Sequence, residues 1–261
     1  MSSLSKFAIS QIIVIFMLVL ILYVFFPVAG ALDRNIIENW MTSQGDFYLR
    51  EHWALATLGH QYVKWILIFC MLLVLLRWIL SFNFKHSKTK LNKNNESKSN
   101  ESKTKEIKTK HSKTKQSQSK QNSENQWRSG YFFLMLLFPI ILIGILKAHS
   151  VHACPWNMTL SAQDHFNWIL NATAGHCFPG GHASAGFSIL AGYFVYRDRD
   201  TKLAHFYLIA GIVLGFAMGW AQMMRGAHFL SHNLWTGVII WTVNVVSYLI
   251  FYSKLNPKRS S

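Results

Sequence analysis

Six apolar runs, separated by polar segments, constrain the fold of this chain more than any other feature of its sequence. A helix needs about 20 apolar residues to cross roughly 30 Å of bilayer hydrocarbon. The third and fourth runs are short, and they reach this length only when Gly130 and Lys147, or Gly180 and Gly181, join their helices. We therefore predict an all-α protein, a polytopic bundle of six transmembrane helices. The runs cover residues 7–32, 63–84, 131–146, 182–196, 203–224 and 234–252.

The composition agrees with a protein of the bilayer, because 51% of the residues are hydrophobic and only 14% are charged. The first apolar run is too long for a secretory signal and has no clear small-residue cleavage site before the charged loop that follows. We therefore expect the first run to be a retained helix.

Basic residues indicate which side of the membrane each polar segment faces, because Lys and Arg collect in cytoplasmic loops. They occur near both termini, in the block of residues 85–128 and in the turn at 197–202. Six crossings place all these segments on one side, which we expect to be cytoplasmic. The loop of residues 33–51 carries four acidic residues against two basic ones. We expect it outside, together with the loops 149–181 and 225–233.

The block of residues 85–128 is a low-complexity segment of Lys, Ser, Asn, Thr, Gln and Glu. Its 13 Lys and Arg and 4 Glu residues contribute +9 of the chain's net charge of +15. Having almost no apolar residues to bury, it is expected to be disordered. It either contacts anionic lipid head groups or serves only as a linker. The predicted divisions are 1–84 for two helices and an outer loop, 85–128 for this block, 129–252 for a four-helix core and 253–261 for a tail.

The three cysteines differ in their surroundings. Cys70 lies within an apolar run and is expected to be a small buried hydrophobic residue. Cys154 and Cys177 both fall in an outer loop, an oxidising compartment, where a disulfide is expected to close a ring of the intervening chain. Zinc binding by these cysteines with His152 or His176 is the alternative, although the chain has no CxxC pair.

Two cations end apolar runs on the outer side, close in sequence to histidines. Lys147 ends the third run and Arg225 the fifth, and ionisable groups at the membrane edge are functional candidates, although either alone would also suit snorkelling to lipid phosphate. The turn 179–181 precedes a helix, and its free amides suit an anion. The two cations would hold phosphoryl oxygens, while one of His182 and His228 attacks phosphorus and the other protonates the leaving oxygen. This pattern predicts phosphoryl transfer through a phosphohistidine at the outer face.

These residues resemble the motifs of the type 2 phosphatidic acid phosphatase superfamily, which shares its core with vanadium haloperoxidases and bacterial acid phosphatases. The family reads KxxxxxxRP, then PSGH, then SRxxxxxHxxxD. This chain has Lys147 followed by Cys154-Pro155, then PGGH at 179–182, then His228. The resemblance spans about residues 129–252 and implies a metal-independent phosphatase without a cofactor. The roles it implies are catalysis by His228 and His182, and phosphate binding by Lys147, Arg225 and Gly181.

Three positions depart from the family's pattern. Cys154 stands where the family has its first arginine, Gly180 replaces serine, and Gln222 occupies the position of a second arginine. Arg225 lies three residues after Gln222, on nearly the same helix face, and is expected to supply the guanidinium. The chain is in this respect similar to bacterial inner-membrane enzymes that carry CPW, PxGHAS and RGAHFxSH signatures.

The residue expected to orient the nucleophile also departs from the family. An aspartate normally lies four residues after the nucleophile, whereas this chain has His232 there. A neutral histidine accepts the N–H bond of the nucleophile but stabilises an imidazolium less than a carboxylate does. Asp164, in the outer loop, is the alternative residue for this role.

The resemblance implies a membrane phosphatase that acts on a lipid phosphate or diphosphate at the outer face of a bacterial inner membrane. The expected substrate is a phospholipid, an isoprenoid phosphate or a lipid A phosphate. A nucleic-acid partner is not expected, because no aromatic residues are interleaved among the lysines of the basic block to stack on bases. Two alternatives stay open: a phosphotransferase that passes the phosphoryl group to another lipid, and a non-catalytic lipid binder or transporter.

Overall fold

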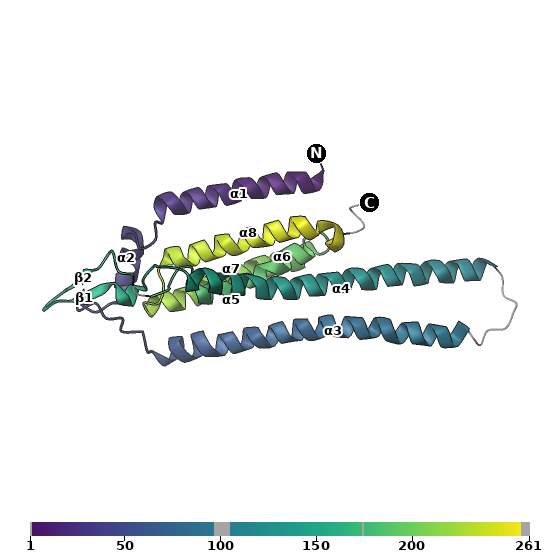
Figure 1. Ribbon diagram of the computed structural model, residues 1–261, viewed down its shortest axis with the longest axis horizontal. Coiled ribbons are helices and arrows are strands. Elements are labelled where there is room, and N and C mark those ends of the chain that lie inside the picture. The colour runs from purple at the N-terminus through teal and green to yellow at the C-terminus, as the bar shows by residue number, and fades with distance from the viewer. Residues whose placement is uncertain (1, 97–104, 174, 257–261) are drawn as a thin grey trace.

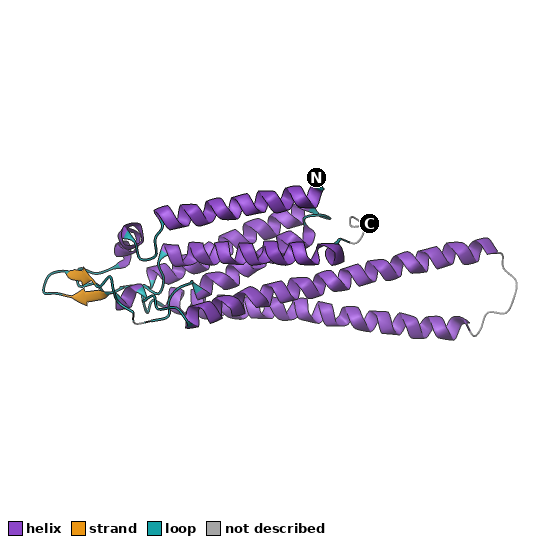
Figure 2. Ribbon diagram, turned by 45° about the horizontal axis from the view of Figure 1, so that its top comes forward, coloured by secondary structure: helices purple, strands orange, loops and turns teal. Residues whose placement is uncertain are grey.

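The computed structural model describes residues 2–96, 105–173 and 175–256 and is an all-α helical bundle (Figure 1). Its helices lie lengthwise beside one another, and a small two-stranded hairpin projects at one end (Figure 2). The α-helices are α1 Ser3–Phe25, α2 Ala31–Ile37, α3 Val63–Glu96, α4 Lys105–Ala148, α5 Gly181–Phe187, α6 Ala191–Tyr196, α7 Thr201–Met224 and α8 Leu230–Leu255. Shorter elements are the 3-10 turns Glu38–Trp40, Pro155–Asn157 and Ser188–Leu190, the π-helical segment Ala54–Tyr62, and the antiparallel strands β1 Thr159–Ser161 and β2 Phe166–Trp168.

Within the described residues, five helices are long and apolar enough to cross a membrane, which indicates a membrane protein. They correspond to five of the six predicted runs. The run 182–196 instead forms α5, a 3-10 turn and α6 in succession. Two serine hydroxyls in this stretch donate to carbonyls three residues earlier, from Ser184 to Gly181 and from Ser188 to Ala185. Such bonds compete with regular helix geometry.

The first helix is shorter than the run that predicted it. It ends at Phe25, two residues before Pro27, and α2 follows as a separate helix. A proline removes a backbone donor and disfavours helical geometry in the residue before it. The outer part of the predicted run therefore turns away and brings α2 across the end of α8.

The segment 85–128 differs from the disordered loop expected from its composition. The structure continues α3 to Glu96 and begins α4 at Lys105, while residues 97–104 lie outside the described part. Lys, Glu and Gln are good helix formers, and extending an existing helix avoids the cost of nucleation. The described residues of this segment are therefore helical despite their low apolar content.

Close helix contacts hold the core that carries the functional loops. A Cβ built on Gly186 of α5 would lie 2.5 Å from the backbone nitrogen of Gly215 in α7, so this crossing depends on glycine. Near the opposite end, α1 packs on α8 through an edge-on contact of Phe7 with Tyr248, ring centroids 5.5 Å apart. The loops that follow α1, α4 and α7 all meet at the end of the bundle that bears the hairpin (Figure 1).

Candidate active site

His228 lies in the turn that joins α7 to α8. Gly226 makes this turn with φ of +76°, a left-handed conformation that favours glycine. A Cβ there would also stand 2.4 Å from the Phe47 ring, which packs over the turn. His228 is consequently 2% exposed, two residues before the first residue of α8.

Hydrogen bonding and burial keep the His228 ring neutral. Its Nδ1 lies 2.8 Å from the Cys177 carbonyl oxygen and must donate to it, which leaves Nε2 as the nitrogen with a lone pair. Burial lowers the pKa of His228 well below its usual value, and the charges of His232, Lys147 and His182 lower it further. A neutral imidazole with a defined tautomer suits a nucleophile.

The disulfide between Cys154 and Cys177 confirms the expected pairing. Because both sulfurs are joined, neither is available as a zinc thiolate. The bridge fixes the segment whose Cys177 carbonyl accepts the His228 bond, and the Cys177 amide donates to the His152 carbonyl at 3.0 Å. The first loop after α4 also reaches the turn that carries His228 directly, since the Trp156 amide donates to the Gly226 carbonyl at 3.1 Å. The disulfide therefore supports the position of His228.

Lys147, Gly181 and His182 meet from two helices. A Cβ built on Gly181 would lie 3.6 Å from Lys147 Cδ and 3.8 Å from Nζ, which places the ammonium beside the first residue of α5. The next residue, His182, has its ring centroid 6.5 Å from that of His228. The structure thus brings both histidines and one of the two predicted cations together.

The structure gives a physical reason for one departure from the family's motif. A Cβ on Gly180 would stand 2.4 Å from Asn233 Oδ1, so no larger residue fits there without displacing this amide. The Gly180 amide donates to the His232 carbonyl at 3.2 Å, and the Gly180 carbonyl accepts from Thr236 Oγ1 at 3.2 Å. These contacts fasten the turn before α5 to the first turns of α8.

Buried polar atoms gather around this turn. Gln222, His232 and Asn233 are at most 2% exposed. Among the described residues, Gln222 Nε2, His232 Nε2 and both side-chain atoms of Asn233 have no hydrogen-bond partner. Buried polar atoms without partners are costly. Three such side chains close to His228 in the chain indicate a place that a polar ligand or water completes.

Arg225 is not directed at the histidines, contrary to the expectation from sequence. Its Nε donates to the Arg50 carbonyl at 2.8 Å and its Nη1 to Gln222 Oε1 at 3.3 Å. The residue stands at the C-terminal cap of α7, where its side chain reaches the loop of residues 33–51 instead. The guanidinium therefore contacts the buried side chain of Gln222.

The two residues expected to orient the nucleophile also change roles. Asp164 is exposed at the turn between β1 and β2, and this hairpin projects away from the bundle (Figure 2), so the structure does not bring Asp164 to His228. His232 Nδ1 lies 3.5 Å from His228 Nδ1, farther than the Cys177 carbonyl at 2.8 Å. A backbone acceptor from the disulfide segment therefore holds the ring more closely than either predicted side chain.

Asp33, which the sequence analysis treated only as a loop charge, lies under the start of α8. It is 2% exposed, accepts from the Ser231 amide at 2.9 Å and from the Ser231 hydroxyl, and also accepts from the Ala29 amide at 3.0 Å. Burial raises its pKa. Phe229 at the N-cap of α8 offers no side-chain bond. Asp33 therefore caps this helix from α2, and the missing local cap was the only sequence signal for it.

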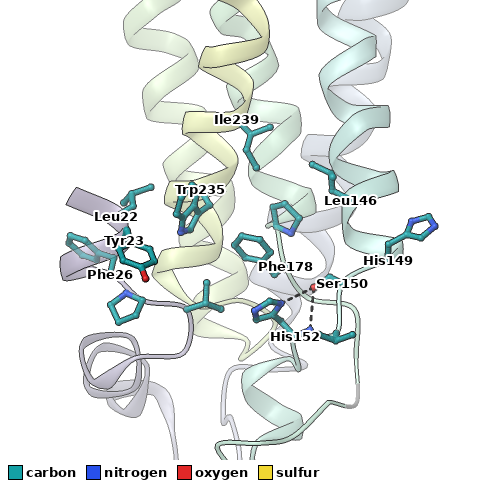
Figure 3. A pocket seen from close by; sticks show the side chains of 14 residues that line it. Leu22, Tyr23, Phe26, Leu146, His149, Ser150, His152, Phe178, Trp235 and Ile239 are labelled. Carbon is teal, nitrogen blue, oxygen red and sulfur yellow. Dashed lines mark hydrogen bonds between the residues drawn. The ribbon is translucent and has the colours of Figure 1, made fainter. Parts of the chain in front are cut away.

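A groove of about 930 Å³ opens beside the histidine turn, between the C-terminal ends of α1 and α4 and against α8 (Figure 3). Phe178 lines the groove and also contacts His232: its ring centroid lies 5.1 Å from His152, 6.5 Å from Trp235 and 5.6 Å from His232. The lining is mostly apolar with a polar edge. It consists of Leu22, Tyr23, Phe26, Pro27, Val28, Leu146, His149, Ser150, Val151, His152, Phe178, Pro179, Trp235 and Ile239.

Comparison with protein families gives a match that agrees with the geometry of the site. No curated protein and no solved structure matches the chain. Residues 128–255 match the PAP2 superfamily, and this range contains both histidines, Lys147 and the disulfide. Membership implies a phosphoesterase, which agrees with a buried neutral histidine beside a second histidine and an ammonium. Through residues 128–255, the chain belongs to the PAP2 superfamily.

Proposed function

We propose that this protein is an integral membrane phosphatase that hydrolyses a lipid phosphomonoester or diphosphate through a phosphohistidine on His228. The observation that carries the proposal is the bond from His228 Nδ1 to the Cys177 carbonyl, which leaves Nε2 to attack. Burial lowers the pKa of His228, so the attacking nitrogen is unprotonated near neutral pH.

In the first step, His228 Nε2 forms a bond to phosphorus while the bond from phosphorus to the lipid oxygen breaks. His182 donates a proton to that leaving oxygen, and Lys147 holds a non-bridging oxygen as its charge shifts. In the second step, water gives a proton to His182 and attacks phosphorus. The bond from phosphorus to Nε2 breaks, inorganic phosphate leaves, and both histidines return to their starting states.

A lipid substrate is supported by the groove beside Phe178. Its apolar lining from α1, α4 and α8 matches a hydrocarbon chain, while His149, Ser150 and His152 add polar groups to the lining. A phosphate next to Gly181 would therefore have its chain continue into the groove. The exposed apolar faces of the long helices supply the bilayer setting from which such a substrate arrives.

The orientation follows from charge. The chain termini and the turn between α6 and α7, with Arg197 and Arg199, lie at the end of the bundle opposite the hairpin (Figure 1). We propose that this basic end is cytoplasmic and that the histidines face the periplasm of a bacterial inner membrane.

Phosphate release from purified protein with a panel of lipid phosphates tests this function. The panel would contain a phosphatidic acid, a phosphatidylglycerol phosphate, an isoprenoid diphosphate and a lipid A, each with and without an acceptor lipid. Release of inorganic phosphate from one class, lost in His182→Ala, supports hydrolysis. Transfer of label to the acceptor lipid would make the protein a phosphotransferase, and binding without turnover in every case would refute an enzymatic role.

A further inference from the structure

A second polar cavity, of about 180 Å³, lies far from the histidines. It is formed where α3, α4 and the turn between α6 and α7 come together. Three of its lining residues are arginines, one from each of these elements, and two are tyrosines. The lining consists of Val74, Arg77, Asn125, Arg128, Ser129, Phe132, Val195, Tyr196, Arg199 and Tyr207.

Two of the arginines are fixed by the protein. Arg128, 7% exposed, donates from Nε to the Leu255 carbonyl at 2.9 Å and from Nη2 to Asn256 Oδ1 at 3.0 Å, so it caps the C-terminal end of α8. Arg199 pairs with Glu124, which is 6% exposed, and donates from Nη1 to Asn125 Oδ1 at 3.3 Å. A guanidinium has five donors, so each retains some for a ligand.

The balance of charge favours an anion. The lining contributes three guanidinium groups, and Glu124 neutralises one of them. Two acids of the adjoining turn flank Arg199 and have other partners: Asp198 accepts bonds from Tyr248 and from Asn256 Nδ2, and Asp200 accepts from the Leu203 amide. An excess of guanidinium groups around a small cavity suits a phosphate, which arginine binds through paired N–H donors.

The position of the cavity along α4 points to the membrane interface. Arg128 and Lys147 stand on the same helix, 19 residues apart in number, which at 1.5 Å per residue separates them by roughly 28 Å. Bilayer hydrocarbon is about 30 Å thick. With Lys147 at one interface, the arginines therefore lie at the other, while Val74, Phe132 and Val195 give the cavity an apolar part.

We propose that this cavity binds the phosphate of an anionic membrane lipid, at the interface opposite the catalytic histidines. The phosphate is held by Arg77, Arg128 and Arg199, and the acyl chains run along the apolar part of the lining. Such a lipid joins α3 to α4 and to the turn before α7. It stabilises the bundle without entering the reaction, and the site does not depend on the proposed function.

Thermal unfolding of the full chain in detergent tests the site. Phosphatidylglycerol is expected to raise the unfolding temperature more than phosphatidylcholine with the same acyl chains. Arg77→Gln is the chosen variant because Arg77 is exposed and has no part in the Glu124 pair. In this variant, at least about tenfold more phosphatidylglycerol should be needed for the same rise in unfolding temperature, which is the loss expected for a charge-assisted bond. Lys202→Gln, at the same end but outside the cavity, removes the same charge and should leave the effect unchanged.

Two further measurements test whether the stabilisation arises at the proposed cavity and whether it needs the whole lipid. Lys147→Ala should retain the stabilisation, because the lipid does not act at the catalytic site. Glycerol 3-phosphate should stabilise far less than the lipid at equal concentration. Equal stabilisation by phosphatidylcholine, equal loss in Arg77→Gln and Lys202→Gln, loss in Lys147→Ala, or full replacement by glycerol 3-phosphate would each overturn the proposal.

Discussion

Removing the carboxylate of Asp33 is expected to disturb the catalytic turn from a distance in sequence. Asp33→Ala deletes the acceptor for the amide and hydroxyl of Ser231, which is 0% exposed and lies between His228 and His232. Both donors would then be buried without a partner. The start of α8 would lose its cap and its favourable negative charge.

The magnitude follows from the contacts. A buried donor left without a partner costs about 1–3 kcal/mol, and loss of a helix cap typically costs about 1 kcal/mol. The two losses overlap at the Ser231 amide, so we expect Asp33→Ala to lower the free energy of unfolding by roughly 2–4 kcal/mol. Asp33→Asn keeps one carbonyl oxygen as acceptor and should cost about 1 kcal/mol.

Stability and kinetics together check this reasoning. Unfolding by denaturant in detergent gives the loss of stability, and phosphate release gives kcat and KM. Since Asp33 holds the start of α8, two residues after His228, and lies outside the groove lining, kcat should fall with KM nearly unchanged, more in Asp33→Ala than in Asp33→Asn. Asp46→Ala removes an exposed acid of the same loop and should change neither. Equal behaviour of Asp33→Ala and Asp46→Ala would refute the capping role.

The remaining predictions concern the disulfide, the cations and pH. A mass-tagged thiol reagent should label only Cys70 before reduction, and Cys177→Ser should lower kcat because the carbonyl bonded to His228 loses its fixed position; labelling of three thiols without reductant would contradict the bridge. Lys147→Ala should weaken inhibition by vanadate strongly, whereas Arg225→Ala, whose donors go elsewhere, should weaken it much less; the reverse order would restore the sequence-based assignment. Burial lowers the pKa of His228, so the unfolded chain binds a proton near pH 6.5 that the folded chain does not. Stability from this group should therefore fall as pH drops below about 6.5. The His228-dependent acid limb of kcat/KM, corrected for substrate ionisation, should lie below that pH, and a limb at or above 6.5 would contradict a neutral nucleophile.

Local sequence signals predicted much of the bundle. An apolar run of sufficient length predicts a helix because every backbone polar group in the bilayer must form a hydrogen bond within its own segment. This requirement depends only on the local sequence. The interruption of the run 182–196 depends on serine bonds such as that of Ser188, which hydropathy does not register. The early end of the first helix could have been predicted from the sequence, because Pro27 stands within the apolar run.

The candidate site was predicted where chemistry depends on residue type and order, and missed where it depends on long-range contacts. His182, His228 and Lys147 come together as expected. The bond from Ser231 to Asp33 spans 198 residues, and the sequence around neither residue indicates its partner. Arg225 was misplaced because helical periodicity gives the face of a residue but not the direction its long side chain takes at a helix end.

The groove also depends on long-range contacts that the sequence does not indicate. Its lining comes from the ends of α1 and α4, from the turn before α5 and from α8, four segments that share no motif. Composition predicted a lipid setting, but the shape that admits a chain arises only when these ends meet around Phe178. Under the proposed function, specificity for one lipid over another would depend on how these segments assemble.

The central claim is that His228 carries the phosphoryl group. The enzyme would be mixed with a substrate labelled at phosphorus, and the reaction would be stopped rapidly without acid. Proteolysis and mass spectrometry would then locate the covalent label. We expect label on His228 alone, labile in acid and stable in base, absent in His228→Ala together with a loss of turnover by several orders of magnitude, and increased in His182→Ala when the leaving group needs no protonation. Label on another residue, or more than about a tenth of wild-type turnover in His228→Ala, would contradict the account.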